Sequence, residues 1–197
     1  MVSTTLASSI RISNTIALAK VSWKVLRKDR ELLLLPVLSF LASIVVLALL
    51  WLPTLSAIDT SGLADESGDP GAVLIVVGVI SAMAMSIISV FFNGALVAGA
   101  HERLSGGDPT VRSAVGRAFS RLSGLLPWAI ITGTVGLILQ AARERAGWMG
   151  RFVVNMVGMA WQTATFLVVP AIVIDDHGAV SGLKASAALL KRTWGEN

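Results

Sequence analysis

The chain has 197 residues, 54% of them apolar and 14% charged, with a formal net charge of +4. Soluble domains carry about 25% charged residues, so this chain has too little polar surface to cover a globule in water. It contains no cysteine. Disulfides, thiolate metal sites, cysteine nucleophiles and lipid attachment through cysteine are therefore excluded.

Residues 1–31 are predicted to form an amphipathic helix. Ile12, Ile16 and Trp23 belong to an apolar face at spacings of three and four residues. Four cations occupy another face: Lys20, Lys24, Arg27 and Lys28. This pattern is typical of a helix in the membrane plane with its cations at the phosphates, and Trp23 suits that interface. The alternative is a solvated helix with a basic face.

Four long stretches contain no Asp, Glu, Lys or Arg: Leu32–Ile58, Pro70–His101, Leu122–Ala142 and Phe152–Ile174. About 20 apolar residues cross the roughly 30 Å of hydrocarbon in a bilayer. A charge at mid-bilayer costs on the order of 3 kcal/mol by insertion scales. We therefore predict four membrane-spanning helices: residues 32–52, 72–100, 123–142 and 152–174.

Prolines and small residues mark points inside these spans. Pro36 lies in the first turns of its helix, where a missing N–H costs little, and Pro53 is expected to end that span. The second span is longer than the hydrocarbon requires, so it must tilt, kink or project, with Asn93–Gly94 as the expected weak point. Pro170 should kink or loosen the last turns of the fourth span.

Two further amphipathic basic helices are predicted at residues 108–122 and 178–194. In the first, Asp108 is expected as the N-cap and Pro109 as the first helical residue. In the second, the apolar face is expected to contain Val180, Leu183, Ala187 and Leu190. The cations of the two helices are Arg112, Arg117, Arg121, Lys184, Lys191 and Arg192. Together with those of residues 1–31, we expect them to contact the headgroups of anionic lipids, or else only to anchor the topology.

The distribution of cations predicts the orientation. Of the 16 Lys and Arg residues, all but Arg143, Arg145 and Arg151 lie on one side of the four predicted spans. The positive-inside rule therefore places both termini in the cytoplasm. Two explanations fit the three exceptions: their side chains extend to the outer phosphates, or spans three and four form a shallow hairpin. We favour the first explanation.

A pattern of four elements occurs twice, over about residues 10–100 and again over 101–176. It consists of a basic helix, a span, an outer loop and a second span. A third basic helix then begins at residue 178. In the first two copies such a helix leads directly into a span. We therefore expect the natural protein to continue past Asn197 with another pair of spans, making six in all.

Three segments carry a resemblance to known proteins: SWKVLRKDRELLLLPVLSF, FFNGALVAGAHERLSGGDPTV and FLVVPAIVIDDHGAVSGLKASAALLKRTWGEN. They resemble a prokaryotic family of uncharacterised multi-spanning membrane proteins, itself distantly similar to the membrane domain of some glycerophosphodiester phosphodiesterases. The resemblance implies an all-helical fold of roughly six spans in a bacterial or archaeal plasma membrane. It implies no known activity.

Chemistry-bearing residues are few. Asn93, Asn155 and Gln162 are polar residues inside the predicted spans. Hydrogen bonds between helices are their expected role, and a polar path for a solute or a cleft for a lipid headgroup is the alternative. No charge lies within a span, which argues against a proton relay. No catalytic or phosphate-binding motif is present, and we expect no metal site and no cofactor.

The sequence thus predicts an all-α transmembrane bundle that forms a single membrane domain over residues 1–197. We expect a non-enzymatic module that engages anionic membrane lipids or a protein partner, which includes a second copy of the chain. Nucleic acid is not an expected partner. The alternative function is transport of a lipid or a small neutral solute past Asn93, Asn155 and Gln162.

Overall fold

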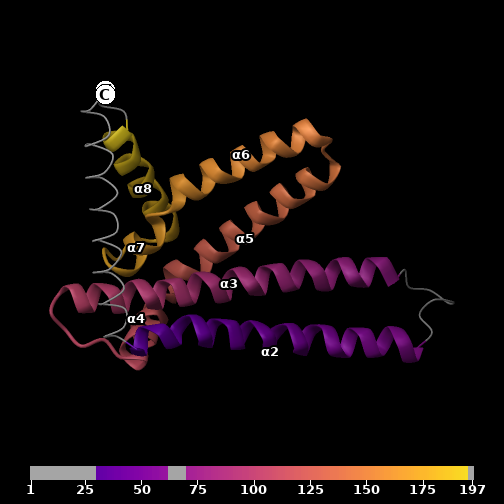
Figure 1. Ribbon diagram of the computed structural model, residues 1–197, viewed down its shortest axis with the longest axis horizontal. Helices are drawn as coiled ribbons and strands as arrows, with labels where there is room; N and C mark the ends of the chain where they lie inside the picture. Colours follow the sequence, from indigo (N-terminus) through magenta and orange to yellow (C-terminus); the bar gives the residue numbers. More distant parts are fainter. Residues whose placement is uncertain (1–29, 62–69, 195–197) are drawn as a thin grey trace, which may run out of the picture.

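The computed structural model describes residues 30–61 and 70–194 (Figure 1). Within this part of the chain the secondary structure is helical and contains no strand. The helices are α2 (Arg30–Ser61), α3 (Pro70–Leu104), α4 (Val111–Ser120), α5 (Leu122–Arg145), α6 (Trp148–Thr165), α7 (Val168–Val173) and α8 (Ala179–Trp194). The all-helical fold class is confirmed. The predicted basic helix of residues 1–31 lies, apart from its last two residues, outside the described part.

Four segments are long and apolar enough to cross a membrane: Glu31–Ile58, Gly71–Leu104, Leu122–Arg145 and Trp148–Val173. They correspond to the four predicted spans, each starting or ending beyond the predicted limits. The expectation that Pro53 ends the first span is wrong, because α2 continues through Pro53 to Ser61. One proline removes a single hydrogen bond, and a spanning helix tolerates that loss where side chains compensate.

The four long helices form two antiparallel hairpins, α2–α3 and α5–α6 (Figure 1). In the first hairpin the indole N–H of Trp51 donates to the Ser81 hydroxyl at 3.0 Å. The hairpins join where α5 crosses α3. There the Ser86 hydroxyl donates to the Ala129 carbonyl at 2.7 Å, and buried Gly94 faces Leu125. A bond between helices is strong where no water competes for it.

Helix α3 is continuous over its 35 residues. At 1.5 Å per residue it is about 52 Å long, so it extends beyond a hydrocarbon layer of roughly 30 Å. The expected weak point at Asn93–Gly94 is wrong. A Cβ at Gly94 would lie 3.0 Å from a Leu125 methyl, so the glycine serves close packing against α5 and not a bend.

The fourth span breaks near Pro170, as predicted. Helix α6 ends at Thr165, and α7 begins at Val168. Because proline has no N–H and its ring clashes with the carbonyl four residues earlier, the chain leaves the helix at Phe166 and Leu167. The short helix α7 then packs beneath α8, and its Val168, Ile172 and Val173 are fully buried.

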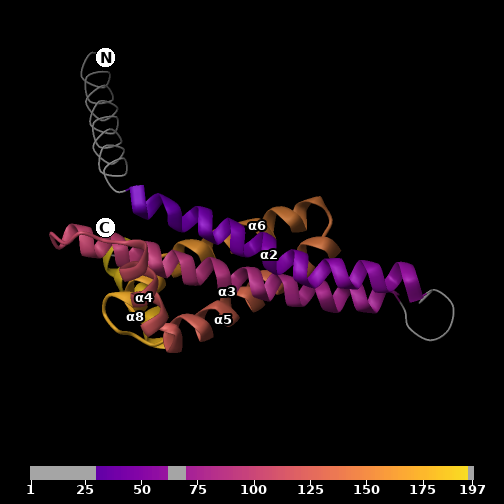
Figure 2. The same cartoon turned by 90° about the horizontal axis from the view of Figure 1, so that it is seen from below.

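The buried core lies at one end of the molecule. This end contains the start of α2, the end of α3, and α4, α7 and α8 (Figures 1 and 2). Leu35 is 0% exposed there, whereas Leu49 on the same helix is 69% exposed. Toward the other end, apolar side chains point outward from α2, α3 and α6. Such a surface suits lipid and not water, because a soluble protein rarely exposes so large an apolar area.

Candidate functional site

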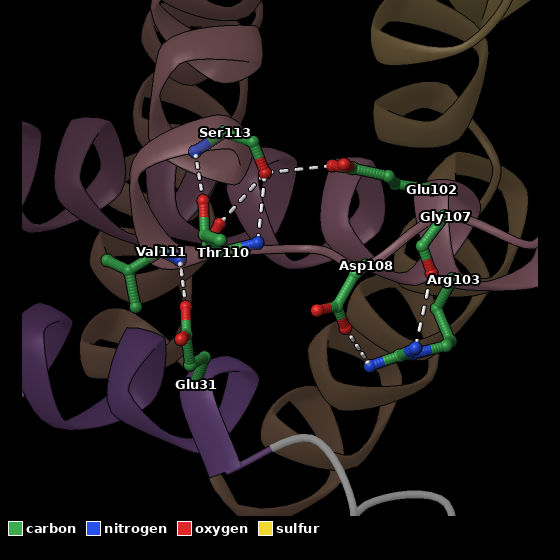
Figure 3. A network of polar contacts seen from close by, with 8 residues as sticks. All are labelled: Glu31, Glu102, Arg103, Gly107, Asp108, Thr110, Val111 and Ser113. Carbon is green, nitrogen blue, oxygen red and sulfur yellow. Dashed lines mark hydrogen bonds and ion pairs between the residues drawn. The ribbon is translucent and has the colours of Figure 1, made fainter.

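Helix α4 begins at Val111 and is held by a capping box. The Thr110 hydroxyl accepts from the Ser113 amide at 3.0 Å, and the Ser113 hydroxyl accepts from the Thr110 amide at 3.0 Å (Figure 3). The expected N-cap, Asp108, is instead paired with Arg103 at 2.8 Å. Because a β-region residue with a hydroxyl can satisfy the free amides of the first turn, Thr110 takes the capping position.

Two carboxylates attach this cap to the neighbouring spans. A carboxylate oxygen of Glu31, at the start of α2, accepts from the Val111 amide at 3.1 Å. The Glu102 carboxylate, near the end of α3, accepts from the Ser113 hydroxyl at 2.8 Å (Figure 3). Negative charge at a helix N-terminus is favourable because the free amides carry partial positive charge. The spans therefore fix the position of α4 through its first turn.

The remainder of α4 separates buried alanines from exposed cations. Ala114 and Ala118 are 0% exposed, whereas Arg112 and Arg117 are exposed. Arg121 follows in the turn between α4 and α5 and is half-buried, with its guanidinium paired to the carboxylate of Asp176. Of the three arginines expected at lipid headgroups, two face outward, and the third contacts the turn between α7 and α8.

Helix α8 packs through small residues. Ser186 is 0% exposed, and its hydroxyl donates to the Ala164 carbonyl at 2.7 Å. Buried Gly182 lies against Val168 and Ile172 of α7. The expected apolar face is partly wrong, because Val180 is 59% exposed and Ala187 is also exposed. The helix turns its smallest residues inward since these allow the closest approach.

The cations of α8, which are Lys184, Lys191 and Arg192, are exposed. Helix α8 runs across the direction of α2 and α3 in Figure 1, and α4 does so in Figure 2. Both views place the two basic helices at the same end of the molecule. The described cations of both helices are therefore gathered at this end. Lys20, Lys24, Arg27 and Lys28 lie outside the described residues.

A polar cavity of about 580 Å³ lies between α3, α5, α6 and α7. Its polar lining residues carry no charge: Ser86, Ser89, Asn93, Thr132, Gln162 and Thr165. Trp128 and Phe166 contribute aromatic surface to the wall. The Trp128 ring is held by stacking against Trp161, with a centroid separation of 6.2 Å.

Hydroxyl groups and amides play different parts at this cavity. The Ser86 hydroxyl donates to the Ala129 carbonyl and lies 3.2 Å from that of Thr132, and the Thr165 hydroxyl donates to the Trp161 carbonyl at 2.7 Å. Among residues 30–61 and 70–194, the side-chain amides of Asn93 and Gln162 have no hydrogen-bond partner. These two amides can therefore donate to and accept from a molecule in the cavity.

A model described as a family of unknown function (DUF6159) matches residues 72–197. The chain belongs to this family. The DUF6159 match includes the cavity-lining residues and both described basic helices. No curated protein and no solved structure matches the chain. The comparisons give no support to the resemblance to the membrane domain of glycerophosphodiester phosphodiesterases.

The structure brings two of the three predicted intramembrane polar residues of this DUF6159 member together. Asn93 and Gln162 line the same cavity, whereas Asn155 is exposed elsewhere on α6. Ser89 and Thr132 also line the cavity and were not among the polar residues predicted from the sequence. Ser86, Ser89 and Asn93 follow one another at spacings of three and four, so a search for polar residues on one helix face finds this stripe.

The described residues contain no cluster of metal-ligating side chains. Within residues 30–61 and 70–194, no three His, Asp or Glu side chains lie close enough together to hold a metal ion. His101 lies in the last turns of α3, and His177 lies in the turn before α8. The carboxylate next to His101, that of Glu102, is bonded to Ser113 at the α4 cap.

Proposed function

We propose that this protein is a non-enzymatic membrane module that engages anionic lipids through its basic helices. The observation that carries the proposal is the placement of α4 and α8 at the same end of four apolar helices, with their cations exposed. A helix across the direction of the spans, at their end, lies at headgroup depth if the spans cross a bilayer. A protein partner at the same surface is the competing occupant.

The expected contribution of these cations is large when they act together. A Lys or Arg near an anionic membrane surface contributes about 1 kcal/mol, and the effect falls off within a Debye length. Arg112, Arg117, Lys184, Lys191 and Arg192 are the exposed cations of the described basic helices. Apolar neighbours such as exposed Phe119 add affinity by inserting below the phosphates.

Lipid retention tests this proposal. The protein is purified from membranes of mixed zwitterionic and anionic lipids, and the bound lipids are quantified by mass spectrometry. Replacing the five exposed cations with glutamine, alone and with Lys20, Lys24 and Lys28 also changed to alanine, should deplete anionic lipid selectively. As a comparison, replacing Arg143, Arg145 and Arg151, at the opposite end, with glutamine measures the anionic lipid held by the outer arginines, and the loss in the basic-helix variants should exceed it. An unchanged amount of bound anionic lipid in both cation-depleted variants would contradict the proposal.

The cavity supports a second candidate function, transport of a small neutral solute or a lipid headgroup. Its lining combines uncharged hydrogen-bonding groups with aromatic surface, the combination that recognises hydroxyl-rich neutral molecules. The chain has no cysteine, so single cysteines at Asn93 and Gln162, with one at Ile80 as a control outside the cavity, can be tested with a water-soluble thiol reagent. Reaction at Asn93 and Gln162 but not at lipid-facing Ile80 supports a hydrated path. Two unreactive cavity positions argue strongly against one.

We further propose a prokaryotic plasma membrane with both termini in the cytoplasm. The gathering of basic helices at one end supports this orientation through the positive-inside rule. A cysteine at Gly147, in the α5–α6 turn, should react with an impermeant thiol reagent on intact cells. A cysteine at Ser120 should react only after permeabilisation. The opposite pattern would invert the topology.

The six-span arrangement is also a proposal. It is supported by the recurrence of a basic helix before a span, since α4 leads into α5 after a single turn residue, Arg121. By that pattern α8 leads into a further hairpin. The coding sequence downstream of Asn197 decides this point: two more charge-free apolar stretches are expected, and a stop codon there would contradict it.

A further inference from the structure

An apolar groove of about 750 Å³ runs between α2 and α4. Leu38, Leu41, Ala42 and Val45 of α2 form one wall, and Phe92 of α3 contributes to the lining. Val111 and Val115 of α4 line the other side. The groove is separate from the polar cavity, which is lined by residues of α3, α5, α6 and α7.

One charged side chain, that of Arg112 on α4, takes part in the lining. Arg112 is exposed, and no ion pair between described residues uses it. Its position on α4 places it at the end of the molecule where α2 starts and α3 ends. The lining itself is apolar on both α2 and α4, and the exposed Arg112 carries its charge at the α4 margin of the groove. This arrangement is complementary to a molecule with an anionic head and a hydrocarbon tail.

The length of the groove fits one acyl chain. Its lining on α2 extends from Leu38 to Val46, and at 1.5 Å per residue this spans about 12 Å along the helix. One leaflet contributes about half of the roughly 30 Å of hydrocarbon in a bilayer. A chain that starts at the phosphate level beside α4 therefore follows α2 through most of one leaflet.

The groove opens toward the lipid-facing surface. Leu41 is 51% exposed and Val45 is 55% exposed, so parts of their side chains remain uncovered by the described helices. An adjacent acyl chain would cover them at no cost in desolvation of polar groups, because the lining at these positions is apolar. A soluble partner would not reach this depth.

We propose that this groove binds one anionic phospholipid, with an acyl chain along α2 and its phosphate on the Arg112 guanidinium. The guanidinium presents a planar set of N–H donors that matches phosphate oxygens in pairs. The inference rests on the proposed lipid-engaging function, which places α4 at headgroup depth, and it adds a defined site to it. Arg112 holds a particular lipid, whereas the other cations contact headgroups in general.

Native mass spectrometry tests the site, with the full chain in nanodiscs of phosphatidylcholine and phosphatidylglycerol. Arg112→Gln should lower occupancy by one retained phosphatidylglycerol about fivefold, the ratio that corresponds to about 1 kcal/mol per cation at the surface. Ala42→Trp should displace the same lipid by filling the groove. The matched controls are Arg117→Gln, an exposed cation of α4 outside the groove, and Leu49→Trp, a bulky substitution on α2 beyond it.

The outcomes separate the two proposals. Selective loss in Arg112→Gln and Ala42→Trp, with retention in both controls, supports the site. Equal loss in Arg112→Gln and Arg117→Gln overturns the site while leaving the general lipid-engaging function in place. If neither arginine substitution nor Ala42→Trp changes retention, the site fails, and the five-cation variant then decides the general function.

A photo-reactive amino acid at Ala42 identifies the occupant directly. Illumination in the same nanodiscs should yield an adduct with the mass of phosphatidylglycerol, and Arg112→Gln should reduce its yield. An adduct to a peptide, either from residues 1–29 of the chain or from a second copy, would overturn the proposal. Correct folding of each variant is checked by its thermal unfolding in detergent.

Discussion

The hydroxyl of Ser186 on α8 donates a 2.7 Å hydrogen bond to the carbonyl oxygen of Ala164 on α6. The break between Thr165 and Val168 interrupts the α-helical bonding there. A carbonyl at such a break needs a partner from elsewhere, and α8 supplies it. This bond couples a basic helix to the fourth span.

Replacing Ser186 with alanine should destabilise the protein by about 1–3 kcal/mol, because a buried carbonyl loses its partner. Thermal unfolding in detergent, followed by circular dichroism, measures the change. Ser181→Ala on the same helix is the control, since Ser181 is exposed and its hydroxyl donates only within its own turn, to the Gly178 carbonyl, where water can replace it. Equal stability of the two variants would show that the Ser186 bond contributes nothing.

The Arg121–Asp176 pair should show a measurable coupling energy. Asp176 has a φ of +62°, which asparagine tolerates, so Asp176→Asn removes the charge without adding backbone strain. A double-mutant cycle with Arg121→Gln should yield a coupling of about 0.5–1 kcal/mol, because Asp176 is 68% exposed and solvent screens the pair. Additive effects of the two substitutions would contradict a direct interaction.

Two glycines of α5 differ sharply in their surroundings. A Cβ at Gly133 would lie 2.7 Å from the Met83 sulfur and 3.0 Å from the Ser86 Cβ. A Cβ at Gly136 would have no such neighbour within 4 Å. Gly133→Val should therefore force α3 and α5 apart and cost about 1–3 kcal/mol. Gly136→Val is the matched control. Thermal unfolding of both variants checks the crossing, and equal stability would show that the helices do not pack there.

Glu31 should stabilise α4 from a position far away in the sequence. Glu31→Ala removes the acceptor of the Val111 amide and should cost about 1 kcal/mol, with Glu31→Gln intermediate because it keeps an acceptor but no charge. The unfolding temperature measures the loss. Glu144→Ala, at the opposite end of the molecule, is the control. An unchanged unfolding temperature in Glu31→Ala would show that the bond to the Val111 amide does not stabilise the protein.

Much of the fold could be predicted from the sequence. The four spans follow from stretches without charge, because the cost of placing a charged side chain in hydrocarbon belongs to each residue and needs no knowledge of its neighbours in space. The break near Pro170 follows equally from the covalent structure of proline. Pro53 shows the limit of this reasoning, since the same residue type lies inside a continuous helix.

The candidate site depended on contacts that no local pattern contains. The sequence by itself determined that Asn93 and Gln162 are uncharged polar residues in apolar helices and that α4 and α8 carry cations. Only the tertiary structure decided that the two amides share one cavity, that Asn155 does not, and that Arg121 contacts Asp176. It also decided that Gly182 and Ser186 form the inner face of α8. The reason is that helix register and close approach are set by steric fit between helices, whereas the preference for lipid is set residue by residue.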